Sequence, residues 1–514
     1  MTTPTSARSD DRADAVATLL AALRRDSHHF GPELATLAAA RGLAFTSPDG
    51  STRPVPIGAT PIVIAKPELD ARIELARSLS SAAAKMARAV LRGPQAERLL
   101  VGLSPLERRT SEQTFESSSP LVTCRVDFFH RFGEPIQALE INATIPAMQG
   151  YSDIASQTFL EVVGRFWGLP EARIAELHAS LGSNAAALHQ ALLAGHRTLR
   201  PGREPNAIAL LCRRFDAQLG ELEWLRDRFR ALGSDADIVH PDQLEGDDAV
   251  RVGAKSYDLI YRHIFVRRLE DPSLPGANYV EALLREPNGT RAVVLNPPAS
   301  PVEEKLTFAL LSTALDDPAL ARQTALDEAE LDAIRRAVPW TRSFCDRELA
   351  ERVAADPDHY VLKRNWDYGG RSVFVGRIRD TPGFRDRLLA TYGDEPSWPQ
   401  LCERALADSE GGGFVVQSLI DSQPEPHVLC STQGRSELDL YVDFSSFASV
   451  GLVETPAWTG VCRGSTSPVV NLHSGGGLLP LLSEDVALAL VDHLRARSLD
   501  AGLQPAAPRS IRAP

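Results

Sequence analysis

The chain has 514 residues, of which 43% are hydrophobic and 24% are charged, a composition typical of a globular protein with about two to four domains. Its formal net charge of −12 argues against a non-specific nucleic-acid binder, so a phosphate site would have to be a local basic pocket. The six cysteines are scattered without a CxxC pair, so we expect no structural zinc and no disulfide framework. No apolar run reaches the roughly 18 residues of a membrane span, and the polar start predicts no signal peptide. We therefore expect a cytoplasmic protein.

The first 100 residues are predicted to form a helical region that serves as packing scaffold. Apolar residues recur at helical spacing over 11–44, and the Gly-Pro pair at 31–32 predicts a break between two helices. A long alanine-rich helix is predicted over 66–91. His28 and His29 could bind a metal, but a solvated helix end explains them more simply. This helical region could also serve a homodimer contact.

Residues 121–142 predict a β-hairpin with polar groups on one face. Strand side chains alternate, so LVTCRVDFFHRFG places Arg125 and Asp127 on one face, and IQALEIN does the same for Glu140 and Asn142. Carboxylate and amide oxygens suit Mg²⁺. The alternative is the solvent-facing side of an amphipathic hairpin, but the apolar segment ATIPAMQGY that follows favours a loop lining a site.

A small parallel sheet is predicted further along the chain, after mostly helical residues 155–200. NAIALLC, a helix over 221–232, DADIVH and YDLIYRHIFV form a strand–helix–strand pattern with short loops. Ligands bind beyond the strand ends of such sheets. Four side chains lie near those ends and could bind an anionic substrate or be ordinary surface charges: Arg213, Arg214, Arg262 and His263.

Two lysines lie in segments that suit phosphate binding. Lys305 falls in the first turn of a helix predicted over 303–315, where it opposes the helix dipole, so a bound phosphate or plain solvation could explain it. Lys363 precedes Gly369 and Gly370 in VLKRNWDYGGRSVFVG, which predicts a hairpin whose glycines let backbone N–H groups approach phosphate oxygens. An ordinary hairpin turn is the alternative.

The last part of the chain predicts helices over 383–407, the link SEGGG and the strand FVVQSLI, which could meet an adenine edge or be a core strand. LDLYVDFSSFAS alternates as a central strand should, and GVCRGSTSPVVNLHSGGG carries Arg463 on another strand. A helix is predicted over 484–497, and the Pro/Ala-rich tail after Gly502 is predicted to be disordered.

Taken in order, four of these segments resemble the circularly permuted ATP-grasp ligases, the group of eukaryotic-type glutathione synthetase and glutathionylspermidine synthetase. CRVDFF with ALEINATIP resembles the family's metal-binding strands, and NPPASPVEEKLTFALL resembles the helix with the first nucleotide lysine. VLKRNWDYGGRSVFVG resembles the second lysine and its glycine loop, and GVCRGSTSPVVNLHSGGG resembles the closing strand. The resemblance covers roughly residues 100–480.

The resemblance implies a role for each matching residue. Nucleotide contacts are implied for Lys305, Lys363, Gly369, Gly370, Arg371, Val416, Gln417, Ser418 and Leu419. Mg²⁺ ligands are implied for Asp127, Glu140, Asn142 and Asp367. Arg125 and Arg463 would stabilise charge on the transferring phosphoryl group and on the acyl intermediate. The chain departs from the family pattern at Lys363-Arg364, where Lys-Pro is common, and at Gln417-Ser418, where the hinge commonly ends in a carboxylate.

The resemblance implies a mixed α/β (α+β) ATP-grasp fold that acts as an ATP-dependent carboxylate–amine ligase, with ATP and Mg²⁺ as cofactors. From the net charge and the lack of a long apolar run, we expect no nucleic-acid partner and no membrane partner. The acid and amine could be an amino acid, a peptide or a polyamine. Two alternatives remain open: a non-catalytic ATP-binding scaffold and a phosphotransferase using the same pocket. We expect five regions: a helical region (1–100), the metal-binding hairpin with helices (101–200), the βαβ substrate domain (201–298), the nucleotide-binding part (299–500) and the tail (501–514).

Overall fold

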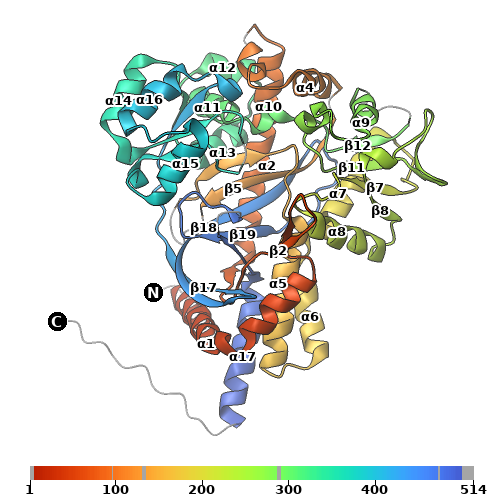
Figure 1. The fold of residues 1–514 in the computed structure, drawn as a ribbon. Coiled ribbons are helices and arrows are strands. Elements are labelled where there is room, and N and C mark those ends of the chain that lie inside the picture. Colours follow the sequence, from red (N-terminus) through yellow and green to blue (C-terminus); the bar gives the residue numbers. More distant parts are fainter. Residues whose placement is uncertain are drawn as a thin grey trace.

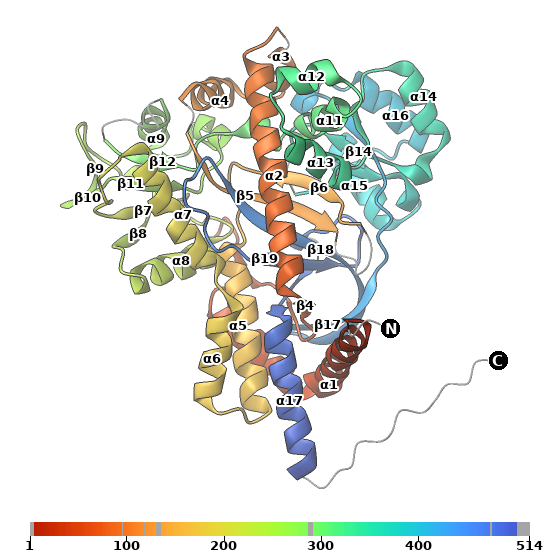
Figure 2. The same cartoon turned by 180° about the vertical axis from the view of Figure 1, so that it is seen from behind.

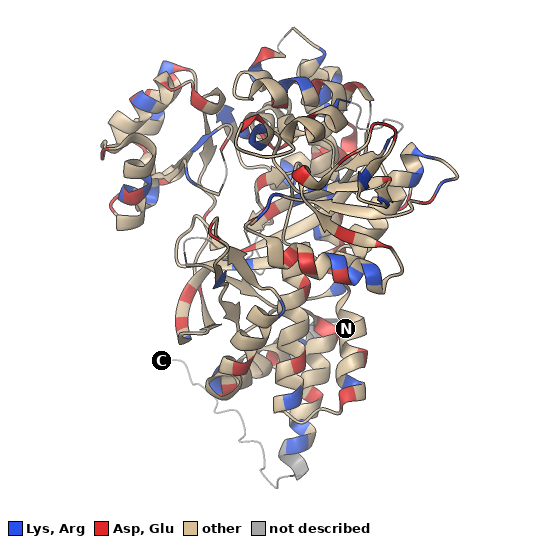
Figure 3. Cartoon of the chain, turned by 45° about the vertical axis from the view of Figure 1, so that its right-hand side comes forward, with Lys and Arg blue, Asp and Glu red and all other residues tan. Residues whose placement is uncertain are grey.

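The computed structural model describes residues 5–94, 96–117, 119–129, 135–285, 291–367, 369–472 and 475–500. The predicted tail (501–514) lies outside these ranges. In the part of the chain that is described, no helix combines the length and the apolar character needed to cross a membrane. Acidic and basic side chains are interspersed over the outer helices (Figure 3).

The centre of the molecule is a seven-stranded sheet with the order β17-β3-β20-β19-β18-β5-β6. Its strands are β3 Ile57–Gly58, β5 Leu121–Phe129, β6 Ala138–Asn142, β17 Glu425–Ser431, β18 Gly434–Val450, β19 Gly460–Ser465 and β20 Gly477–Leu479. The hairpin predicted over 121–142 is therefore confirmed as β5 and β6, which pair antiparallel at the edge of this sheet. The N-terminal region contributes β3, so it takes part in the sheet as well as packing on it.

Helix α2 covers the back of the central sheet, and its bounds, Lys66–Leu91, are those predicted from the sequence (Figure 2). It packs in one hydrophobic cluster with Cys124, Val126 and Phe128 of β5. Because strand side chains alternate, Arg125 and Asp127 lie on the opposite face of β5. The packing of α2 thus sets which side of the sheet carries the polar residues.

The predicted small parallel sheet is confirmed, with the order β12-β11-β7-β8. Its strands are β7 Ile208–Leu211, β8 Ala236–Val239, β11 Leu259–Arg262 and β12 Val293–Leu295. Helix α8 (Leu219–Ala231) connects β7 to β8, as the strand–helix–strand pattern predicted. The carboxyl ends of β7 and β11 therefore lie side by side.

A third sheet has the order β13-β16-β14-β15 and is antiparallel. Its strands are β13 Thr341–Ser343, β14 Tyr360–Arg364, β15 Val373–Val375 and β16 Phe414–Ser418. Leu362, Phe374 and Val416 share a hydrophobic cluster with helices on its outer face, namely α14 Arg347–Ala355, α15 Pro382–Tyr392 and α16 Trp398–Ala407 (Figure 1). Lys363 and Gln417 alternate with these residues and so lie on the other face.

The predicted break at residues 31–32 is wrong, because α1 runs without interruption from Thr5 to Ala40 with Pro32 inside it. The glycine at 31 has a packing role instead. A Cβ atom there would lie 2.7 Å from Sγ of Cys430 on β17, so only glycine lets the helix approach the strand this closely.

The helix predicted over 303–315 is confirmed as α11 (Lys305–Ala314), but it begins two residues later than predicted, after a separate short helix α10 (Ser300–Glu303). Glu304 between them is extended, with φ −62° and ψ 137°. The helical segment predicted over 383–407 is confirmed as α15 and α16, and α15 ends at Gly393, which is in the left-handed region at φ 78°.

The structure contains further helices and strands besides these three sheets. The other helices are α3 Glu97–Leu100, α4 Pro105–Ser117, α5 Gln149–Phe166, α6 Glu171–Leu181, α7 Asn184–Leu199, α9 Ala277–Leu284, α12 Pro318–Gln323, α13 Glu328–Ala337 and α17 Glu484–Asp500. The other strands are β1 Ala44–Thr46, β2 Thr52–Pro54, β4 Ile62–Ile64, β9 Val250–Val252, β10 Lys255–Tyr257 and β21 Leu481–Ser483. Helices α1, α5 and α17 pack together below the central sheet (Figures 1 and 2).

Candidate active site

A cavity of about 480 Å³ lies where the three sheets face one another. The central sheet contributes Arg125, Asp127, Glu140, Asn142, Asp443 and Arg463 to its wall. The antiparallel sheet and its loops contribute Val361, Lys363, Gly369, Gly370, Gln417 and Leu419. The ends of the parallel sheet contribute Arg213, Asp216 and His263. Residues that are far apart in the chain are thus brought to one cavity.

Strand register explains why the polar residues of the hairpin meet. Asp127 lies opposite Glu140 and Arg125 lies opposite Asn142 in the β5–β6 pair. Directly opposed residues of antiparallel strands project to the same face. The prediction that each pair shares a face is confirmed, and the two pairs share the same face.

The cavity wall contains a buried ionic network of two arginines and two aspartates, namely Arg125, Arg463, Asp127 and Asp443. Arg125 donates to both carboxylate oxygens of Asp127, at 2.7 and 3.0 Å. Arg463 donates from Nη2 to Asp127 at 2.9 Å and from Nε to Asp443 at 3.1 Å. Sequence reasoning missed Asp443. Its signal was a carboxylate placed between the buried apolar residues Val442 and Phe444 in the middle of a strand.

The network sets the charge state of its members. Burial raises the pKa of Asp127, but the charges of Arg125 and Arg463 outweigh burial and hold that pKa well below its usual range. Burial raises the pKa of Asp443, and the charge of Arg463 only partly offsets it. Within the described residues, Nη1 of Arg463 donates to no protein group, so this nitrogen is available to an anion in the cavity.

Lys363 is a buried cation at the junction of two sheets. Its Nζ donates to the Leu139 carbonyl at 3.0 Å and to Oε1 of Gln417 at 2.7 Å. Burial lowers the pKa of Lys363 to about 8, because Glu140 only partly compensates for the lost hydration. An anionic ligand would restore the charged form.

Lys305 lies behind Lys363, at the start of α11. It lines a small hollow of about 10 Å³ that it shares with Lys363, Gln417 and Glu140. Its Nζ donates to the Asp367 carbonyl at 2.9 Å and lies 3.9 Å from Oε2 of Glu140. The two lysines predicted to bind phosphate are therefore neighbours.

Asn365 ties the segments of the two lysines together, and sequence reasoning did not identify it. Its Oδ1 accepts from the Leu306 backbone N–H at 2.7 Å and so caps α11. Its Nδ2 donates to Glu304 at 2.6 Å, which holds the break between α10 and α11. One side chain thus fixes both the helix that carries Lys305 and the loop after Lys363.

The glycine turn closes over one side of the cavity. Gly369 and Gly370 have φ angles of 66° and 69°, in the left-handed region that favours glycine. Asn471 Nδ2 donates to the Gly369 carbonyl at 2.7 Å, and a Cβ atom on Gly370 would lie 2.7 Å from Cγ1 of Val469. The turn and the segment around residue 470 are therefore in contact.

The other residues predicted to bind nucleotide or metal occupy different positions. Gln417 and Leu419 line the cavity, whereas the Val416 side chain is packed in the hydrophobic cluster of the outer helices. Ser418 donates its backbone N–H to the Trp340 carbonyl, and Arg371 is exposed. Oδ2 of Asp367 accepts a hydrogen bond from the Ser372 hydroxyl at 2.6 Å. Asp367 is not among the described residues that line the cavity.

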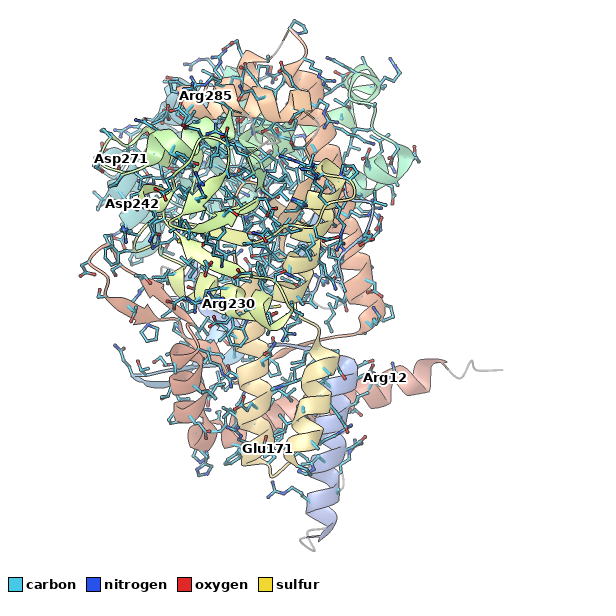
Figure 4. All side chains as sticks on the ribbon, turned by 90° about the vertical axis from the view of Figure 1, so that its right-hand side faces the viewer. Arg12, Glu171, Arg230, Asp242, Asp271 and Arg285 are labelled. Atoms are coloured by element: carbon cyan, nitrogen blue, oxygen red, sulfur yellow. The ribbon has the colours of Figure 1, made fainter. Side chains whose placement is uncertain are left out.

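The predicted acceptor-binding residues divide into two groups. Arg213 and His263 line the cavity. Arg262 is fully buried and donates to backbone carbonyls, including those of Asn296 and Ile264, so its role is structural. Arg214 is paired with Asp242 at the surface, at an edge that also carries Asp271 (Figure 4).

Comparison with known proteins identifies the fold. No protein-family model matches the chain, and no curated protein matches it. A solved structure, the apo form of a glutathione synthetase-like effector from Globodera pallida, aligns with a TM-score of 0.57 and 11% sequence identity, over 89% of this chain and 97% of the effector. The chain has a mixed α/β, glutathione synthetase-like fold. The similarity extends into the first 100 residues, which the sequence motifs left out.

Proposed function

We propose that the chain is an ATP-dependent carboxylate–amine ligase with a circularly permuted ATP-grasp fold. The observation that supports it best is the convergence of Lys363, Arg125 and Arg463 on one cavity whose wall also carries Glu140 and Asn142. Several buried cations facing one space suit a polyanion such as a triphosphate. The glutathione synthetase-like fold is consistent with this chemistry.

The residues fit Mg²⁺ in part. Glu140 lines the cavity with a partly exposed carboxylate, and Asn142 uses its Nδ2 on Asp127, which leaves its amide oxygen for a cation. Asp127 is engaged by two arginines and fits the role of their counter-ion better than that of a ligand. No cluster of three or more His, Cys, Asp or Glu side chains suited to a metal occurs among the described residues. Glu140 and Asn142 would therefore hold Mg²⁺ together with phosphate oxygens, and the ion would neutralise phosphate charge.

In the proposed reaction, the γ-phosphoryl group moves to the substrate carboxylate and forms an acyl phosphate. Lys305 and Lys363 hold the phosphates, and Arg125 and Arg463 neutralise charge on the transferring group. The backbone around Gln417 and Leu419 contacts the adenine, and the turn at Gly369 excludes water from the reactive acyl phosphate. An amine then displaces phosphate and forms the amide bond.

The proposal is tested by phosphate release from Mg·ATP with a panel of amino acids, small peptides and polyamines, with products identified by mass. The expected result is phosphate together with a product of mass acid plus amine minus water. Lys363→Met should abolish both phosphate release and product formation, whereas the matched surface variant Lys66→Met should retain both. ATP binding without any product would favour a scaffold, and an amine-independent phosphorylated product would favour a phosphotransferase.

A further inference from the structure

A cluster of titratable side chains lies at the carboxyl ends of the parallel strands β7 and β11, where this sheet meets the cavity. His263 follows β11, Asp216 lies in the loop after β7, and Glu221 is in the first turn of α8. Their exposed fractions are 5%, 6% and 1%. Asp216 and His263 line the cavity. The reaction steps assigned above leave all three unused.

The His263 imidazole is buried without a hydrogen bond. Its Nδ1 lies 3.6 Å from Oδ1 of Asp216, and neither ring nitrogen has a hydrogen-bond partner within the described residues. Its backbone N–H donates to the Leu211 carbonyl at 2.7 Å, which fixes the main chain at the end of the sheet. Buried polar groups without partners are uncommon, and each calls for an explanation such as a bound ligand, a water or a role in the chemistry.

The cluster is connected to the ionic network by residues 147–150, which lead into α5. Glu221 Oε1 accepts from the Met148 backbone N–H at 2.8 Å and from that of Gly150 at 3.0 Å. Arg125 donates to the carbonyl of Ala147, the residue before Met148, at 3.0 Å. The cluster is therefore one loop away from the arginine that would neutralise the transferring phosphoryl group.

Charges around His263 favour its protonated form. Burial lowers the pKa of His263 and Arg262 opposes protonation, but Asp216 and Glu221 outweigh them, so the pKa is raised above its usual 6.5. Burial raises the pKa of Asp216, but His263 outweighs burial and lowers it. Burial raises the pKa of Glu221 to about 7. In the same loop, Nε of Arg213 lies 3.9 Å from Oδ2 of Asp216.

We propose that Asp216 and His263 form the proton-accepting unit for the attacking amine, with Asp216 contacting the ammonium group and His263 holding the proton. This inference rests on the proposed ligase function. An ammonium group has no free electron pair, so it must lose a proton before it attacks. The proton passes through the Asp216 carboxylate to Nδ1 of His263 and leaves an ion pair. The freed electron pair forms the C–N bond, the C–O bond to phosphate breaks with its electrons on phosphate, and the second amine proton leaves with phosphate or to water.

The decisive test compares two nucleophiles in wild type and in His263→Asn, which keeps an amide donor near Asp216 but cannot hold a proton. Hydroxylamine is uncharged at neutral pH and needs no proton acceptor before attack. Carboxylic acids are screened with Mg·ATP and hydroxylamine, and hydroxamate is measured beside amide formation with amines. The variant is expected to keep hydroxamate formation and to lose amide formation at least tenfold.

Each other outcome overturns the inference. Equal loss of hydroxamate and amide would mean that His263 only shapes the cavity, and no loss of either would mean that it takes no part. If wild type forms no hydroxamate with any acid, the ligase proposal fails, and this inference fails with it.

A pH measurement tests the pairing without a substrate. The His263 resonance, assigned by its loss in His263→Asn, is expected to titrate above pH 6.5 in wild type and at lower pH in Asp216→Asn. With substrate, the rate of amide formation is expected to rise with pH through the pH at which His263 titrates. This inflection in the rate is expected to be absent in His263→Asn. Titration unaffected by Asp216→Asn would contradict the pair.

Discussion

The lowered pKa of Lys363 predicts that ATP affinity falls with pH. The group is charged below its folded pKa of about 8 and neutral above it. A bound triphosphate favours the charged form, so binding takes up a proton wherever the free lysine is neutral. About a tenth of Lys363 is charged one unit above that pKa, so affinity should fall about tenfold between pH 7 and pH 9 if only the charged form binds.

Isothermal titration calorimetry at several pH values measures this dependence, and buffers of different ionisation enthalpy count the protons taken up. Lys363→Arg is the matched control, because arginine stays charged across this range and its ATP affinity should be nearly independent of pH. Affinity that stays constant in wild type from pH 7 to pH 9, or that falls equally in the arginine variant, would refute the reasoning.

Three further predictions follow from the cavity wall. Glu140→Gln should abolish turnover at an unchanged urea midpoint, because the Glu140 side chain is 38% exposed; near-normal turnover would contradict its role with Mg²⁺. Asp127→Asn should instead lower the free energy of unfolding by about 3–5 kcal/mol, because it leaves buried arginine charge unpaired. An unchanged urea unfolding curve would exclude a structural role for the ionic network. Gly370→Ala and Gly369→Ala share a left-handed backbone cost of about 1–2 kcal/mol, but only the first collides with Val469. Gly370→Ala alone should therefore raise the KM for ATP several-fold, and equal KM values would contradict closure of the turn on that residue.

The sequence was informative where local periodicity decides the structure. Alternation in β5 and β6 places Arg125 with Asp127 and Glu140 with Asn142, because a strand can project them in no other way. The bounds of α2 follow from its proline near the start and its alanine-rich apolar face. The parallel sheet followed from short apolar strands separated by a helix, and its strand ends pointed to His263.

The sequence was uninformative where a contact between distant segments decides. Asp443 joins the ionic network only because β18 and β19 place it opposite Arg463, and that register is not visible in either segment alone. Asn365 caps a helix about sixty residues earlier in the chain. Pro32 is tolerated within α1, where the neighbouring glycine is required by the approach of Cys430, which local propensity does not reveal.

Transfer of oxygen-18 from the acid substrate tests the central claim most directly. The substrate carboxylate is labelled with oxygen-18, the reaction is run with unlabelled Mg·ATP and the amine, and the released phosphate is analysed by mass. An acyl phosphate intermediate passes one carboxylate oxygen to phosphate, so the account predicts singly labelled phosphate in proportion to the amide formed. Amide formation with unlabelled phosphate would contradict phosphorylation of the carboxylate and the roles assigned to the cations around the cavity.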